Sequence, residues 1–178
     1  MSNVFFIGDP HLGHRNIVKF RKYLGFATEP EHREWIMDNW QSVVGNRDKV
    51  FVMGDAAFGE DALKEFAKLN GNKVLIRGNH DDGWTAREAL TYFQDIHGML
   101  KYKKFWLTHC PIHPNELWGK VNIHGHVHKN SVNDPRYFNV SVENINGTPI
   151  TFQEIQKRVA ENVASFNATG KIKHGLDL

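Results

Sequence analysis

Short apolar runs alternate with amphipathic segments along the first half of the chain. Three runs have the length and the β-branched or aromatic content of buried strands, at residues 4–7, 50–53 and 74–76. Between them, helices are predicted over 15–23, 31–44 and 61–69, where apolar residues lie at helical spacing. The turn Asn70-Gly71-Asn72 ends the third helix. This alternation predicts parallel strand pairing with right-handed crossovers.

The pattern changes in the second half of the chain. After a helix predicted over 85–92, residues 96–102 and 105–108 have the character of antiparallel strands, and further strands are expected at 121–123 and 137–142. A capping-box sequence at 151–154 opens a final helix. The buried stripe of that helix is expected to be Ile155, Val159, Val163 and Phe166. Residues 170–178 are expected to form a loose tail. Because the chain has no repeat or linker, residues 1–178 are predicted to form a single domain.

Composition narrows the class of protein. With 178 residues, 40% hydrophobic and 24% charged, the chain is typical of one soluble globular domain. The net charge of +2 is too small to require a nucleic-acid partner. Cys110 is the single cysteine, which excludes an intrachain disulfide and suits a reducing compartment. The first residues lack the basic segment of a signal peptide, and no apolar run approaches the ~20 residues that span a bilayer. We therefore expect a cytoplasmic protein that makes no membrane contact.

Five short polar segments each follow an apolar run. They are Asp9-Pro10-His11, Gly54-Asp55, Gly78-Asn79-His80-Asp81, His109 and Gly125-His126-Val127-His128. In open α/β sheets, ligands gather just beyond the carboxyl ends of the strands, so we expect these side chains to meet. Glycine precedes the polar residues of three segments, at Gly8, Gly54 and Gly78, where it allows a tight turn and close backbone approach. Carboxylate, imidazole and amide groups together suit Mn, Fe, Zn or Ni. The five segments indicate a two-metal hydrolytic site.

These segments occur in the order that marks one family. The motifs Asp-x-His, Gly-Asp, Gly-Asn-His-Asp, a single His and Gly-His-x-His span residues 9–128, and the chain resembles the calcineurin-like metallophosphoesterases. The resemblance implies an α/β fold of the α+β type with four layers, in which two mixed β-sheets pack face to face and helices lie outside. It also implies a hydrolase acting on phosphoric ester bonds.

The resemblance further implies a role for each motif residue. Asp9, His11 and His128 would hold a first metal, Asn79, His109 and His126 a second, and Asp55 would bridge both. The cofactors would be two divalent ions, with manganese favoured and iron, zinc or nickel as alternatives. A metal-bound hydroxide would attack phosphorus. The catalytic residues would be His80, as acid or phosphate contact, and Asp81, which would orient the His80 ring.

Several residues near the motifs have two interpretations. His14 and Arg15 either contact the substrate phosphate or decorate a helix, and His113 is equally open between a substrate contact and a surface residue. His124 is expected to be a hydrogen-bonded structural histidine. Arg77 is expected to reach solvent from the end of a strand.

Charged and aromatic residues outside the motifs are expected to have ordinary roles. Two basic stretches favour solvated faces, with a polyanionic substrate as the alternative; they are Arg15, Lys19, Arg21 and Lys22, and Lys101, Lys103 and Lys104. Trp84 and Trp118 are expected at the edge of the core, with base stacking as the alternative. Cys110 is expected to be a small buried residue.

Together these patterns predict a metal-dependent phosphoesterase. The chain has little spare length for a lid, so the site is expected to be open, which favours a phosphodiester or nucleotide-type substrate. The partner is expected to be a phosphate ester, with a nucleotide or single-stranded nucleic acid as candidates. The alternatives within the same family are a phosphomonoesterase, a protein phosphatase and a nuclease. A scaffold that keeps the fold without catalysis is disfavoured because His80 and every inferred ligand are present.

Overall fold

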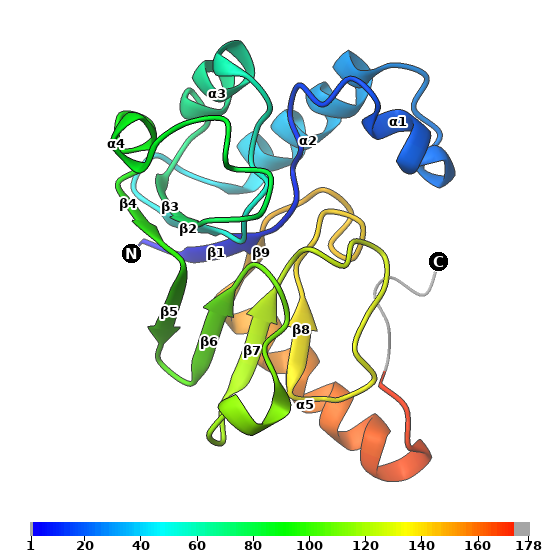
Figure 1. The fold of residues 1–178 in the computed structure, drawn as a ribbon. Coiled ribbons are helices and arrows are strands. Elements are labelled where there is room, and N and C mark those ends of the chain that lie inside the picture. The colour runs from blue at the N-terminus through cyan, green and yellow to red at the C-terminus, as the bar shows by residue number, and fades with distance from the viewer. Residues whose placement is uncertain (1, 173–178) are drawn as a thin grey trace.

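A five-stranded sheet contains the three strands predicted in the first half of the chain. The computed structural model describes residues 2–172 and gives this sheet the order β4-β3-β2-β1-β9 (Figure 1). Its strands are β1 (Val4–Ile7), β2 (Lys49–Val52), β3 (Asn72–Ile76), β4 (Asp95–His97) and β9 (Ile150–Thr151). β1, β2 and β3 run parallel, as predicted. β4, from the segment predicted to be antiparallel, is parallel to β3, and β9 is antiparallel to β1.

The second sheet has four strands in the order β5-β6-β7-β8. They are β5 (Met99–Tyr102), β6 (Phe105–Thr108), β7 (Val121–His124) and β8 (Tyr137–Asn139). The predicted antiparallel pairing of β5 with β6 is confirmed, whereas β6, β7 and β8 are parallel. Both sheets are therefore mixed, and the predicted fold class is confirmed.

Two predicted strands are shorter in the structure than the sequence pattern indicates. Residues 96–102 do not form one strand, because the chain leaves the five-stranded sheet after β4 and enters the four-stranded sheet at β5, with Gly98 between them. Similarly, 137–142 ends as a strand at Asn139, and Ser141 pairs instead with Gly8, beyond the end of β1. Alternation of apolar residues predicts extended backbone but does not specify which sheet a strand joins.

The two sheets pack face to face through aromatic side chains. The Phe6 ring of β1 lies 5.3 Å from Phe51 of β2, and 6.3 and 6.4 Å from Tyr102 and Phe105 of the other sheet. Phe152, the first residue of α5 (Phe152–Thr169), contacts the same Tyr102 and Phe105 rings. Edge-to-face contacts of this kind add to the burial of apolar area that stabilises the core.

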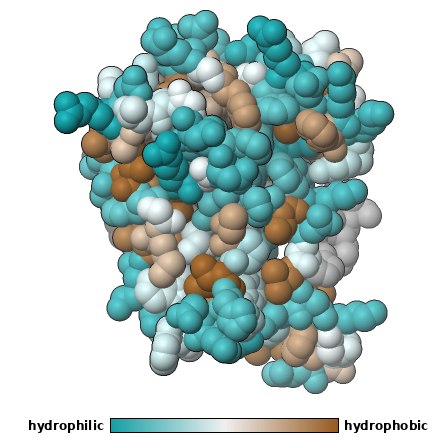
Figure 2. Space-filling model, in the orientation of Figure 1, coloured by the Kyte–Doolittle hydropathy of each residue, from teal (hydrophilic) through white to brown (hydrophobic). Residues whose placement is uncertain are grey.

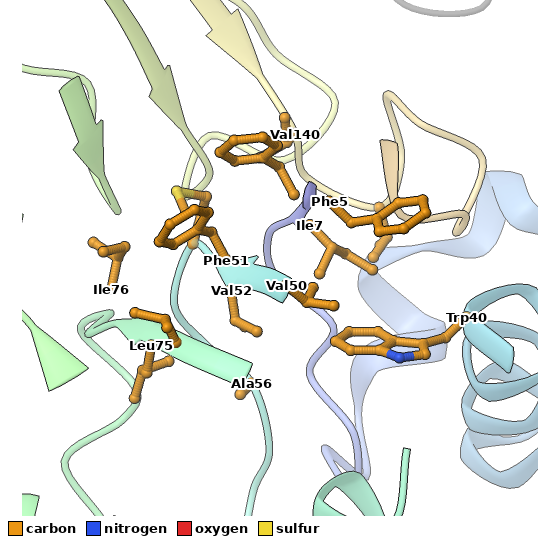
Figure 3. Close-up of a cluster of buried hydrophobic side chains, with 14 of the residues drawn as sticks. Phe5, Ile7, Trp40, Val50, Phe51, Val52, Ala56, Leu75, Ile76 and Val140 are labelled. Carbon is orange, nitrogen blue, oxygen red and sulfur yellow. The ribbon is translucent and has the colours of Figure 1, made fainter. Parts of the chain in front are cut away.

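Most of the helices gather around the five-stranded sheet in Figure 1. They are α1 (Ile17–Phe20), η1 (Lys22–Leu24), α2 (Glu29–Val43), α3 (Glu60–Ala67) and α4 (Ala86–Ala89). Trp40 of α2 is fully buried against Phe66 of α3, and Figure 3 shows its ring lying toward Val50 and Ile7. These contacts fix α2 and α3 on the sheet. The short helix η2 (Pro114–Glu116) lies between β6 and β7 in the chain.

Helix boundaries differ from the predictions where side chains or caps intervene. The helix predicted over 15–23 is interrupted at Arg21, so that α1 and η1 are separate. The predicted buried stripe of α5 is wrong at Val163, which is 41% exposed, whereas its neighbour Asn162 is buried. The Thr151 hydroxyl accepts a hydrogen bond from the Glu154 amide, which is one half of the predicted capping box. The Glu154 carboxylate does not complete the box and instead accepts a hydrogen bond from Arg158.

The C-terminal end of α5 is anchored rather than loose. Gly170 caps the helix in the left-handed conformation. Ile172 is buried, and its amide donates a hydrogen bond to Asn133. The chain is thus still packed at residue 172, and the rest of the predicted tail, 173–178, lies outside the described residues. None of the helices within residues 2–172 is both long and apolar enough to cross a membrane.

The face shown in Figure 2 is mostly hydrophilic, with hydrophobic residues in small separate groups. The exposed large apolar side chains include Phe20, Tyr23, Leu90, Met99 and Trp118. Trp118 is 74% exposed, so its predicted place at the edge of the core is wrong. Trp84 packs on Phe93 at 6.2 Å between ring centroids, which confirms the expected core-edge position.

Candidate metal centre

The seven predicted metal ligands meet at one end of both sheets. Each follows the carboxyl end of a strand: Asp9 and His11 follow β1, Asp55 follows β2, Asn79 follows β3, His109 follows β6, and His126 and His128 follow β7. Parallel strands within each sheet bring these ends together. The structure thereby gathers residues that are more than a hundred positions apart in the sequence.

One donor set consists of Asp9, His11 and His128. Their ligand atoms lie within 4.8 Å of one another. His11 Nε2 is 3.9 Å from Asp9 Oδ1 and 3.5 Å from Asp55 Oδ2. Both ring nitrogens of His11 are buried without a hydrogen-bond partner. Burial, together with the charge of Arg21, holds the pKa of His11 far below its ordinary value. A buried, neutral and unpaired imidazole beside two carboxylates fits a divalent metal.

The other donor set is Asn79, His109 and His126. Asn79 Oδ1 is 2.8 Å from His109 Nε2 and 3.0 Å from His126 Nδ1. His109 Nε2 is also 3.5 Å from Asp55 Oδ2. The other nitrogen, His109 Nδ1, donates to the Met53 carbonyl oxygen at 2.7 Å, which leaves the Nε2 lone pair directed at this cluster. The carboxylate of Asp55 thus lies between the two donor sets, at 3.5 Å from a histidine of each.

Five of the seven ligands have left-handed backbone conformations. The φ angles of Asp9, His11, Asp55, His126 and His128 lie between 52° and 69°. Positive φ is uncommon for residues other than glycine, although Asp and His tolerate it better than most. Such conformations cluster at functional sites, where the surrounding structure holds them.

Close backbone approach explains two of the motif glycines. Gly54 has a φ of +82°, and a Cβ atom there would collide with the His109 ring. A Cβ atom on Gly125 would collide with the Asp9 carboxylate. The glycines therefore let the Asp55 and His126 segments come close enough for their ligands to meet.

The comparisons with known proteins agree with this geometry. The family model for calcineurin-like phosphoesterases matches residues 2–167. The chain belongs to this family. It is 31% identical to an uncharacterized protein, MJ1445, of Methanocaldococcus jannaschii, over 89% of this chain and 92% of that one.

Two further relatives support the membership. The chain is 36% identical to the Gene 66 protein of Mycobacterium phage L5, with 72% of this chain and 78% of that protein covered. The crystal structure of AQ665 from Aquifex aeolicus, described as a protein of unknown function, matches with a TM-score of 0.71 and 26% identity. That match covers 88% of this chain and 99% of the other.

In this member of the calcineurin-like phosphoesterase family, the Asp9 carboxylate has several hydrogen-bond partners within the protein. It accepts hydrogen bonds from the Ser141 hydroxyl at 2.6 Å and from the His126 amide at 2.9 Å. Burial raises the pKa of Asp9 to about 6, and a bound cation acts in the opposite direction. Ser141 was not foreseen. It reaches Asp9 because the chain crosses from β8 to the end of β1.

Arg21 and Glu143 form a buried ion pair behind the first donor set. Arg21 Nε donates to Glu143 Oε1 at 2.7 Å, and Arg21 Nη2 donates to the Asp9 carbonyl oxygen at 2.7 Å. Arg21 is 1% exposed. The prediction that 15–22 forms one solvated basic face is therefore wrong at Arg21. Ile17 and Arg21 are four residues apart and both face inward, a spacing that could have signalled this.

Glu143 also orients His128. His128 Nδ1 lies 2.8 Å from Glu143 Oε1, so a proton on Nδ1 leaves Nε2 free to bind a metal. Burial alone would raise the pKa of Glu143, but the hydrogen bond from His128 and the charge of Arg21 hold it below its ordinary value. No sequence pattern links Glu143 to His128, 15 positions away, or to Arg21, 122 positions away.

Asp81 has a different role from the one predicted. Its carboxylate accepts hydrogen bonds from the backbone amides of Asp55, Ala56 and Gly78 at 2.7–3.0 Å. The Asp81 carboxylate therefore fixes the Asp55 loop and does not orient the His80 ring as predicted. His80 is exposed beside the donor sets, and its amide donates to Asp55 Oδ1 at 2.9 Å.

A cleft of about 610 Å³ opens beside the first donor set. His14 and His80 line it with the ligands His11, His126 and His128. Two other predicted substrate residues lie elsewhere. Arg15 is exposed outside the cleft lining, and His113 caps η2 by accepting a hydrogen bond from the Asn115 amide. Of these three predicted contacts, only His14 is brought to the cleft.

Three other predictions concern residues around the centre. Cys110 is exposed, so its predicted burial is wrong. Arg77 donates to the carbonyl oxygens of Asp81 and Trp84 and does not simply reach solvent. His124 is buried and bonds the Gly125 carbonyl oxygen, which confirms a structural role, and burial lowers its pKa to about 4.

Buried His32 is expected to make stability depend on pH. Arg21 Nη1 donates to His32 Nε2 at 2.8 Å, and burial lowers the pKa of His32 from 6.5 to about 3. Between pH 6.5 and about 3, His32 is protonated in the unfolded chain but neutral in the folded one. The stability that neutral His32 contributes is therefore complete above pH 6.5. It declines as the pH falls, by up to about 1.4 kcal/mol per pH unit. His32→Gln keeps an acceptor but cannot titrate. Urea unfolding of the chelated proteins between pH 6.5 and 4.5 should show a shallower decline for this variant, and parallel curves would contradict the assignment.

Proposed function

We propose that this phosphoesterase hydrolyses a phosphodiester or nucleotide-type substrate at a dinuclear metal centre. The main support is the position of Asp55, whose Oδ2 lies 3.5 Å from a histidine nitrogen of each donor set. A shared carboxylate between two sets of nitrogen and oxygen donors fits a pair of divalent ions of the borderline class, with manganese favoured. The exposed free thiol of Cys110 suits a reducing cytoplasm.

The chain's own residues supply the ligands and a proton. Asp9, His11 and His128 would hold one ion, Asn79, His109 and His126 the other, and Asp55 both. When bound, two such ions lower the pKa of a coordinated water and stabilise the charge of a phosphoryl group. His80 stands exposed at the cleft, with its backbone fixed by Asp55, where its ring can donate a proton to the leaving oxygen.

Hydrolysis of bis-p-nitrophenyl phosphate tests the proposal. The purified full chain should release nitrophenolate when manganese is added and should lose this activity after chelation. Parallel assays with iron, zinc and nickel cover the other metals of this class. Protein that binds two metals by elemental analysis but hydrolyses neither aryl nor nucleotide esters would instead favour a non-catalytic scaffold.

The role of His80 should depend on the leaving group. A nitrophenolate leaves without a proton, whereas an alkoxide needs one, and general acids typically contribute ~10²–10⁴-fold. His80→Ala should therefore lose far more kcat/KM on an alkyl nucleotide ester than on the corresponding nitrophenyl ester. Both metals should stay bound, because His80 is not a proposed ligand. Equal losses on the two esters would exclude the general acid and leave a purely electrostatic contact.

Metal loading should protect Cys110. The ligand atoms of Cys110, His109 and His126 lie within 4.8 Å of one another, so an ion at the second site would crowd the thiol. Alkylation by iodoacetamide should be slower in manganese-loaded than in chelated protein. Asn79→Ala, which weakens the second site, should show a smaller difference. Identical rates with and without metal would place the bound ion away from this donor set.

A further inference from the structure

The cleft continues beyond the metal centre to two exposed aromatic rings. Phe20 and Tyr23 line it together with Ile17, Val127 and Lys129. Phe20 is 71% exposed and Tyr23 51% exposed. Exposed large apolar side chains that share one wall of a cleft indicate a surface used for binding.

The aromatic wall is held at a fixed place relative to the ligands. Arg21 lies between Phe20 and Tyr23 in the chain, and its buried side chain bonds the carbonyl oxygen of Asp9 and the carboxylate of Glu143. Ile17, one turn earlier, is also buried. The segment that carries the two rings is therefore anchored to the first donor set, with the Phe20 ring largely exposed and the Tyr23 hydroxyl directed at Glu143.

The span from the candidate metal ligands to Phe20 matches the span from the phosphate of a nucleotide to its base. The His14 ring lies 5.8 Å from the ligand His11 and 5.9 Å from Phe20. Phe20 is therefore one imidazole ring away from the centre. A ribose separates the phosphate of a nucleotide from its base by a comparable span, and the cleft volume of about 610 Å³ is within the range of small-ligand sites.

Charge at the rim agrees with an anionic ligand. Lys129 follows the ligand His128 directly and is exposed, with its Nζ 5.0 Å from the Tyr23 ring centroid. The acidic residue that lines the cleft, Glu143, is engaged by Arg21 and His128. A ligand entering along this wall thus meets flat apolar surfaces and a cation.

We propose that Phe20 and Tyr23 form a subsite for the base of a nucleoside phosphoester, whose phosphate lies at the metal centre and whose sugar lies beside His14. This inference rests on the proposed function and specifies its substrate class. Aromatic side chains stack on nucleobases of any sequence, so the subsite selects a nucleoside over an alkyl group and does not select one base.

A matched pair of esters isolates this subsite. Thymidine 5′-(p-nitrophenyl phosphate) and methyl p-nitrophenyl phosphate share the same leaving group and differ only in the nucleoside. For the manganese-loaded wild-type chain, kcat/KM should be higher for the thymidine ester. In Phe20→Ala and in Tyr23→Ala the ratio of the two kcat/KM values should fall by about 5- to 150-fold, the loss expected for one base-stacking contact. Trp118→Ala removes an equally exposed aromatic outside the cleft and should leave the ratio unchanged.

A binding measurement separates failure of the subsite from failure of the proposed function. Calorimetric titration with thymidine monophosphate and with inorganic phosphate needs no turnover. Tighter binding of thymidine monophosphate, lost in Phe20→Ala, supports the subsite even in a chain that hydrolyses neither ester. Equal affinity for the two ligands, or an unchanged ester ratio in both variants, overturns it. A thymidine oligomer hydrolysed more than tenfold better than the mononucleotide ester, with steep salt dependence, would also overturn it in favour of a polymer groove.

Discussion

Asp55→Ala should lose both metals and reduce kcat/KM by at least ~10⁴-fold, the upper end of what a single general acid contributes. Asp55 is the residue placed between the donor sets, with Oδ2 at 3.5 Å from His11 Nε2 and from His109 Nε2. Its Oδ1 also accepts the His80 amide at 2.9 Å. Removing one carboxylate therefore weakens both metal sites and frees the proposed acid.

Two matched variants make this result specific. Asn79→Ala should mainly deplete the second site, so elemental analysis should find about one metal per chain. Asp55→Asn keeps the shape and the acceptor for the His80 amide but removes the charge, and it separates loss of metal from local unfolding. Two tightly retained metals in Asp55→Ala, with an unchanged circular dichroism spectrum, would rule out the bridging role.

Arg21→Met should destabilise the protein by about 3–5 kcal/mol, the cost of breaking a buried ion pair by removing one partner. Arg21 and Glu143 are a buried pair joined at 2.7 Å, with side chains only 1% and 2% exposed. Without the guanidinium, the Glu143 carboxylate is left buried beside His128, and the Asp9 carbonyl oxygen loses a donor. Leaving one buried charge unpaired costs more than replacing the pair with neutral groups.

Two further variants serve as controls for Arg21→Met. Arg15→Met removes an exposed arginine six residues earlier and should change the unfolding free energy by no more than about 0.5 kcal/mol. The double variant Arg21→Met, Glu143→Gln should recover part of the loss, because no unpaired charge remains. Urea unfolding of the chelated proteins measures all three. Equal midpoints for Arg15→Met and Arg21→Met would show that the pair contributes nothing.

The assignment of the candidate ligands to two metals came from the resemblance to the family and stays a prediction. Asp9, Asp55, Asn79, His109 and His126 could be placed at one edge by local pattern, because each belongs to a short motif at the end of an apolar run and parallel strands end at a common edge. The residues that support them could not. Glu143 is 122 positions from Arg21, and Ser141 is 132 positions from Asp9. Residues so far apart in the sequence belong to no common helix or strand, so the pattern of apolar residues does not indicate that they meet.

Sheet membership and exposure were also beyond local pattern. Residues 96–102 alternate as one strand, but the chain changes sheets at Gly98, a choice decided by packing of the complete fold. Cys110 was expected to be buried and Trp118 to pack at the edge of the core, yet both are exposed. Residue type gives an average tendency to be buried, and residues near a site depart from that average.

The left-handed backbone of five ligands sets a limit on how this protein can be made more stable. Each such conformation typically costs about 1–3 kcal/mol in a residue other than glycine. Replacing one of these five residues by glycine would relieve that cost in the metal-free chain but would remove a candidate metal ligand. The five are Asp9, His11, Asp55, His126 and His128. A programme of directed evolution that rewards heat resistance alone is therefore drawn toward inactive proteins, and selection for turnover must be applied at the same time.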